Sequence, residues 1–125
     1  MKPKAKVLTG QELEIMKIVW AAGPVTVRDV YETLREKRAI AYTTVMTIMN
    51  ILVDKKHLKK KTVDRVFSYE PTRPKEKVIA ALVKDFLGRV FDGSARPLLV
   101  QLVEDRHLSD EDLRDIERLI EEKSK

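Results

Sequence analysis

The stretch from Ala41 to Lys56 constrains the fold more than any other part of the chain, because it predicts one helix with two unlike faces. Apolar side chains recur at the spacing of a core-facing stripe: Val45, Ile48, Met49 and Leu52, with Val53 beside them. On another face the same spacing gathers Thr43, Met46, Thr47 and Asn50. An exposed helix face normally carries Glu, Lys and Arg, which form helices better than Thr and Asn. The uncharged face therefore needs its own explanation.

Two explanations are open on this stretch alone. Short side chains with hydroxyl, amide and methyl tips suit a helix in the DNA major groove, where Asn pairs with adenine and Thr reaches base edges or a thymine methyl. The same side chains could instead cover a neighbouring helix.

The distribution of charge favours the first explanation. Residues 1–71 carry 14 Lys and Arg against 8 Asp and Glu, whereas residues 72–125 carry 11 against 12. The net charge of +5 therefore belongs to the first part of the chain. A basic module followed by a near-neutral one predicts polyanion binding in the first part and a different task in the second.

Catalytic and metal-dependent functions find little support. The chain has no cysteine, which excludes disulfides, thiolate metal sites and Cys nucleophiles. His57 and His107 lie in different segments, without a metalloprotease motif or a Gly-rich phosphate loop. We expect no enzyme, no cofactor and no metal. The amino end lacks the apolar core of a signal peptide and no run is long enough to span a membrane, so we expect a cytoplasmic protein without membrane insertion.

Start and stop signals predict a first helix before the opening stretch. Thr9 followed by Glu12 is the pattern of a capping box, and Leu8 with Leu13 forms the matching hydrophobic staple. The helix should run to about Ala22, before Gly-Pro. Its buried stripe is expected to contain Leu13, Met16, Val19 and Trp20, with Ile15 at one edge.

A second helix is expected at about residues 27–38, with Thr26 as its cap and Asp29 at the third position. Val25 before it is expected to be a short strand residue. Its buried stripe should contain Val27, Val30, Tyr31 and Leu34. This helix, a tight connection and the helix with the uncharged face form a helix-turn-helix. Residues 42–44 then lie in the first turn of the recognition helix, whose backbone N–H groups attract phosphate.

Alternating apolar residues after this helix predict a β-hairpin, or wing. Leu58 and Val63 belong to one strand and residues 66–69 to the other, around a polar turn at Asp64-Arg65. Six of the eleven residues from 55 to 65 are Lys or Arg, enough for several salt-sensitive phosphate contacts. Such a charge run is usually only a solvated face. Its position directly after the suspected recognition helix favours DNA.

The second part predicts three short helices. Pro74 opens the first, which runs to about Phe91. Ser94 is expected to cap the second, with Pro97 in its first turn, and Ser109 to cap the third with Asp112. Helices this short bury little alone, so a second copy of the chain is the natural partner for their apolar stripes. The alternative is that they pack back onto the first part as one monomeric domain.

Several segments resemble a known family. Residues 8–20, 26–30, 41–48 and 65–69 are similar, in order, to the successive motifs of the penicillinase-repressor family of BlaI-, MecI- and CopY-like regulators, and Phe91-Asp-Gly-Ser94 resembles the entry to its dimerisation region. The resemblance implies a winged-helix repressor that binds double-stranded palindromic operator DNA as a homodimer until a signal releases it. A membrane sensor or protease partner is implied by the resemblance alone.

The chain departs from the family pattern in three places. Lys56 and Asp64 stand where the family usually has glycine, which puts the entry to the wing in question because Lys is strained in a left-handed conformation. The cysteine-rich tail of the copper-responsive members is missing. The Asn-Phe pair that is cleaved in the penicillinase branch is also missing.

The sequence thus predicts a mostly α fold with a small β wing: a winged helix-turn-helix at residues 1–71 and a three-helix dimerisation region at 72–125. Expected base or groove contacts are Thr43, Thr44, Met46, Thr47 and Asn50; expected backbone contacts are Tyr42, Lys59, Lys60, Lys61 and Arg65. The expected dimerisation residues are Phe86, Val90, Leu98, Leu99, Leu102, Leu113, Ile116, Leu119 and Ile120. A winged helix that binds protein rather than specific DNA is the alternative.

Overall fold

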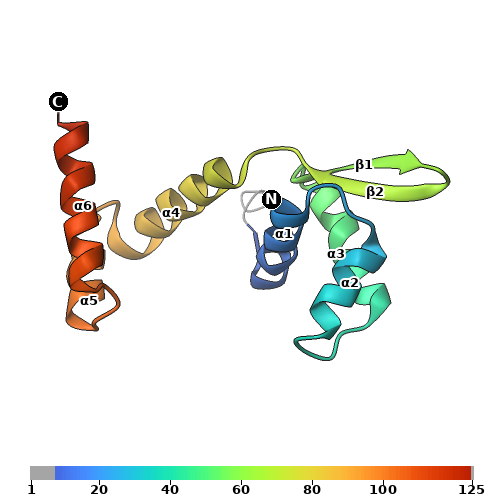
Figure 1. The fold of residues 1–125 in the computed structure, drawn as a ribbon, viewed down its shortest axis with the longest axis horizontal. Coiled ribbons are helices and arrows are strands. Elements are labelled where there is room, and N and C mark those ends of the chain that lie inside the picture. The colour runs from blue at the N-terminus through green and yellow to red at the C-terminus, as the bar shows by residue number, and fades with distance from the viewer. Residues whose placement is uncertain (1–7, 125) are drawn as a thin grey trace. The chain divides into compact units, whose positions relative to one another are not determined.

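The computed structural model describes residues 8–124, which fold into helices and one two-stranded sheet in a simple linear order (Figure 1). The elements are α1 (Gly10–Ala22), α2 (Val27–Arg35), α3 (Tyr42–Asp54), β1 (Leu58–Val63), β2 (Val66–Pro71), α4 (Lys75–Phe91), α5 (Arg96–Glu104) and α6 (Asp110–Lys123). This confirms the predicted fold class, mostly α with a small β wing.

Two compact units divide between Ala80 and Ala81, inside α4. The domain boundary expected from the sequence, after Pro71, remains a prediction. The first turn of α4 belongs to the winged-helix unit because Val78 is buried there, only 5% exposed.

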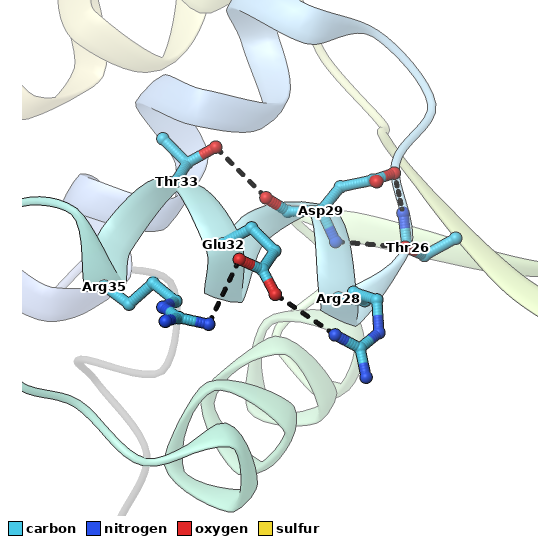
Figure 2. Close-up of polar contacts among 6 residues, drawn as sticks. All are labelled: Thr26, Arg28, Asp29, Glu32, Thr33 and Arg35. Atoms are coloured by element: carbon cyan, nitrogen blue, oxygen red, sulfur yellow. Dashed lines mark hydrogen bonds and ion pairs between the residues drawn. The ribbon is translucent and has the colours of Figure 1, made fainter.

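The starts of α1 and α2 are fixed by reciprocal side-chain caps, as predicted. At α1, Thr9 N donates to Glu12 Oε1 over 2.9 Å and Glu12 N donates to Thr9 Oγ1 over 3.2 Å. At α2, Thr26 and Asp29 exchange the same pair of bonds over 3.0 and 3.1 Å (Figure 2). Each cap satisfies backbone donors that the first turn would leave open.

The core of the first unit lies where α1, α2, α3 and the base of the wing meet. The stripe predicted for α3 is confirmed, because Val45, Ile48, Met49 and Leu52 are all buried. One detail of α1 was wrong: Ile15, expected at the edge, is 1% exposed, whereas Leu13 and Trp20 keep partial exposure. The second helix also ends earlier than expected, at Arg35, because Lys37 N and Arg38 N both turn back to the Leu34 carbonyl.

The wing is a regular antiparallel hairpin whose register runs from Leu58 opposite Pro71 to Val63 opposite Val66. The predicted turn at Asp64-Arg65 is confirmed, with φ of 51° and 68°. Two successive positive φ values are the signature of a type I′ turn, whose twist matches that of the strands it joins. Lys56 is also left-handed, with φ of 71°, so both usual glycine positions keep the glycine conformation with other residues in it.

Val25 ties the loop before α2 to the wing. Its N–H donates to the Tyr69 carbonyl over 2.9 Å, and Tyr69 N–H donates back to the Val25 carbonyl over 2.7 Å. This isolated bridge confirms the predicted strand residue and anchors β2 at the position of Tyr69.

The second unit contains the rest of α4, α5 and α6. The Ser109–Asp112 cap of α6 is confirmed, with both bonds at 3.0 Å. The predicted cap at Ser94 is wrong: α5 starts one residue later, after Ala95, and Ser94 N instead donates to the Phe91 carbonyl. Ser94 is held there because Gly93, at φ 86°, closes the end of α4.

Candidate nucleic-acid interface

The predicted reading face of α3 is open in the winged-helix unit. Tyr42, Thr43, Thr44, Met46 and Thr47 are exposed, whereas Asn50 is half-buried. None of these side chains packs into the core, which lies under the opposite stripe of the helix. Within this unit, therefore, the face does not cover a neighbouring helix.

A groove runs beside this face, with a volume of about 450 Å³. Its walls come from the start of α2, from α3 and from the wing: Thr26, Val27, Arg28, Tyr42, Met46, Asn50, Lys60, Val66, Phe67 and Tyr69. Four of the predicted contacts thus line one concave surface: Tyr42, Met46, Asn50 and Lys60. Thr43, Thr44 and Thr47 lie on the exposed face of α3 outside the lining.

Sequence reasoning missed Arg28, Val66 and Phe67 as parts of this surface. Arg28 is the second residue of α2, two positions after the Thr26 cap, so it lies at the end of that helix that borders the groove. Its position was visible in the sequence, but the packing of that helix end beside the wing was not.

Arg28 belongs to a short charged row along α2 (Figure 2). Glu32 accepts from Arg28 Nη1 over 3.1 Å and from Arg35 Nη1 over 3.4 Å, and the Arg35 guanidinium lies 5.7 Å from the centre of the Tyr31 ring. The Tyr31 ring in turn meets Tyr42 edge-on at 5.5 Å. Exposed pairs of this kind contribute little stability, so the arginines can exchange Glu32 for a phosphate at small cost.

Lys60 lies on the wing face that is turned toward α3. Its Nζ donates to Asn50 Oδ1 over 3.3 Å and lies 4.1 Å from the centre of the Phe67 ring. Tyr69 OH donates to the same Asn50 oxygen over 3.3 Å. Asn50 was predicted to contact bases and Lys60 to contact the DNA backbone, but in the structure the two side chains are hydrogen-bonded to each other.

Lys59 and Lys61 lie on the other face of the hairpin, because successive side chains of a strand alternate. Both pair with Glu70, over 3.3 and 3.0 Å. Lys61, and then Lys59, hold the pKa of the Glu70 carboxyl below its ordinary value by donating hydrogen bonds to it. One carboxylate therefore offsets part of the positive charge that the sequence assigned to phosphate binding, whereas Arg65 is exposed at the hairpin tip.

Comparison with known proteins agrees with this geometry. The family model described as penicillinase repressor matches residues 8–122. The chain belongs to the penicillinase repressor family.

Relatives of this family member carry names of regulators. It is 37% identical over 95 residues to the transcriptional regulator BlaI of Mycobacterium tuberculosis, covering 74% of this chain and 69% of that protein. It is 25% identical over 115 residues to the penicillinase repressor of Bacillus licheniformis, covering 92% and 90%. The solution structure of the DNA binding domain of the repressor BlaI matches with a TM-score of 0.52 and 26% identity, over 58% of this chain and 88% of that one.

Two further structural features bear on what this family member can do. Residues 8–124 contain no group of three or more His, Cys, Asp or Glu side chains placed to hold a metal ion. Among the same residues, each helix is too short or too polar to cross a bilayer.

Proposed function

We propose that this penicillinase repressor family member is a transcriptional repressor that occupies operator DNA and blocks transcription until a signal releases it. The observation that carries the proposal is the exposed, uncharged face of α3 beside a basic hairpin, in a chain whose relatives are named transcriptional regulators and repressors. The α3 face enters the major groove, and the wing lies along the backbone.

The individual roles follow from side-chain chemistry. Thr43, Thr44, Met46, Thr47 and Asn50 face base edges from successive turns of α3. Ala41, which precedes α3, has no side-chain cap, so the first backbone N–H groups of the helix point toward a phosphate together with Tyr42.

The backbone contacts come from Lys60, Arg65, Lys59 and Lys61, and Arg28 adds a cation from the far wall of the groove. Lys59 and Lys61 contribute less than the other two, because Glu70 pairs with both and competes with phosphate for their ammonium groups. Since phosphate contacts release bound counterions, affinity falls steeply as salt rises.

Exposed apolar side chains of the second unit support a homodimer. Val90, Leu99, Leu119 and Ile120 are about half exposed, at 52%, 46%, 55% and 59%, and Phe86 is 39% exposed. Leu98, Leu102, Leu113 and Ile116 are only partly covered by the chain itself. Large exposed apolar surfaces are rare on monomers, and a second copy of the same helices would cover this one.

The test is the binding of intact protein to non-specific duplex DNA at low and at moderate salt. A DNA reader binds at low salt and releases as salt rises, with log affinity linear in log salt. A winged helix that serves only as a protein-interaction module shows no such binding. An affinity for duplex DNA that does not fall linearly with salt on logarithmic axes would contradict the proposal.

A further inference from the structure

The wing fixes the orientation of the Asn50 amide. Its Oδ1 accepts from Lys60 Nζ and from Tyr69 OH, both over 3.3 Å. An ammonium group has three donors and no acceptor, so the amide atom that faces it must be the oxygen. A carbonyl oxygen has two lone pairs, and these two donors occupy both.

The two donors are held in place before any ligand arrives. Lys60 and Tyr69 are directly opposite each other in the hairpin register, so their side chains leave the same face of the sheet. Tyr69 is 1% exposed and is bonded through its backbone in both directions to Val25. The ammonium of Lys60 rests over the Phe67 ring at 4.1 Å, which favours this position through a cation–π contact.

The amino group of Asn50 remains available. Its Nδ2 donates to no protein atom in the part of the chain that the structure describes, and it is not among the buried side-chain atoms that lack a partner. It therefore reaches solvent, at a position that lines the groove between α3 and the wing.

We propose that Asn50 reads DNA as a donor only, and so prefers a base that offers acceptors in the major groove. Guanine offers two acceptors there, O6 and N7, and no donor, whereas thymine offers only O4. Adenine sets its N7 acceptor beside an amino group that meets the Asn50 amino group donor to donor, and cytosine offers only an amino group, so a G·C pair is favoured over A·T. This differs from the usual pairing of Asn with adenine, which needs the amide oxygen and nitrogen together. The inference rests on the proposed function of the chain and names the base class that one residue selects.

Lys60 and Tyr69 are then positioning residues for specificity, acting through Asn50. Removing both donors with Lys60→Met and Tyr69→Phe frees the oxygen, and the amide can then pair with adenine through both atoms. The expected change at that base pair is a gain for A·T relative to G·C of roughly tenfold.

The experiment is selection of bound sequences from random duplex DNA with the full-length protein and its variants. Asn50→Ala identifies the base pair concerned, as the one position where preference is lost. At that position the wild-type protein is expected to select a G·C pair, and the double variant is expected to shift toward A·T. Lys84→Met is the matched control, because it removes an exposed lysine of α4 that has no part in the proposed DNA contacts; it should leave the base preference unchanged.

If the double variant does not fold, the single variant Lys60→Met tests the same change in base preference, because Lys60 is exposed. A wild-type preference for an A·T pair at the Asn50 position would overturn the inference while leaving the repressor function standing. An unchanged preference in both Lys60 variants would also overturn it. Absence of any selected sequence for the wild-type protein would overturn the proposed function, and the inference with it.

Discussion

In the proposed interface Glu70 competes with DNA phosphate for two wing lysines, so Glu70→Gln should strengthen DNA binding. The carboxylate pairs with Lys59 and Lys61 at 3.3 and 3.0 Å, on the hairpin face opposite to Lys60. Glutamine has nearly the same shape but no charge, so both ammonium groups become free for phosphate. Glu70 is only half-buried and is not among the buried core residues, so the change leaves the apolar core untouched.

The magnitude follows from counterion release. Each phosphate contact adds about 0.9 to the slope of log affinity against log salt, so two freed lysines steepen the slope by up to about 1.8. Over a change from about 50 to about 200 mM salt, this corresponds to roughly a tenfold greater loss of affinity in the variant than in the wild-type protein. The variant should therefore bind more tightly at low salt, and its advantage should shrink as salt rises.

The pKa of Glu70 decides the pH at which the variant and the wild-type protein should be compared. The pKa of Glu70 lies below its ordinary value of 4.5, because Lys61 and Lys59 donate hydrogen bonds to the ionised form. The ion pairs are therefore complete above about the ordinary pKa and are lost as the pH falls through the lowered one. At neutral pH Glu70 is fully ionised, so the wild-type protein and Glu70→Gln differ there by one full negative charge.

The assay is fluorescence anisotropy of labelled duplex DNA at four or more salt concentrations. Glu111→Gln, which removes an exposed acid from α6, controls for the change in total charge. Equal slopes for Glu70→Gln and the wild-type protein would refute the reasoning, since they would mean that neutralising Glu70 gives Lys59 and Lys61 no added phosphate contact. An equal gain from Glu111→Gln would show that total charge alone is responsible.

Other substitutions test the packing and the assembly. Glu12→Gln keeps an acceptor for the α1 cap but loses the ion pair of a 5%-exposed carboxylate with Lys55 at 2.8 Å. The free energy of unfolding in urea should therefore fall by about 2 kcal/mol, and an unchanged unfolding midpoint would contradict this. Lys56→Gly relieves a left-handed residue at φ 71° and should raise the free energy of unfolding by about 0.5 to 1 kcal/mol, and a loss of stability would speak against strain at that position. Leu98→Asp with Leu102→Asp places charge in the proposed dimer surface, so the protein should sediment as a monomer at micromolar concentration and lose most operator affinity; a dimer that persists would argue against that surface.

Features set by near neighbours in the chain could be predicted from the sequence. Thr9, Thr26 and Ser109 each cap a helix as expected, because a capping box involves residues only three apart. The core stripe of α3 and the hairpin turn at Asp64-Arg65 follow from periodicity and turn chemistry in the same way. Ser94 failed as a cap because Asp92 and Gly93, both at positive φ, close α4 in a turn in which Ser94 N donates to the Phe91 carbonyl, so α5 starts one residue later.

Features set by contacts between distant segments could not be predicted. In the sequence the wing lysines form one basic run. In the hairpin, strand alternation places Lys60 on one face and Lys59 and Lys61, paired with Glu70, on the other. The sequence also indicated Asn50 as an independent reader of DNA. The hairpin register decides that Lys60 and Tyr69 meet its oxygen, and no local pattern around Asn50 carries that information.

Selection of bound fragments from random duplex DNA by the intact protein tests the central claim most directly. If α3 reads bases and two copies bind together, the enriched sequence should be a palindrome whose half-sites lie about one helical turn, or a multiple of it, apart. Enrichment of no sequence, with all fragments bound equally or none bound, would contradict the assignment of α3 as a recognition helix.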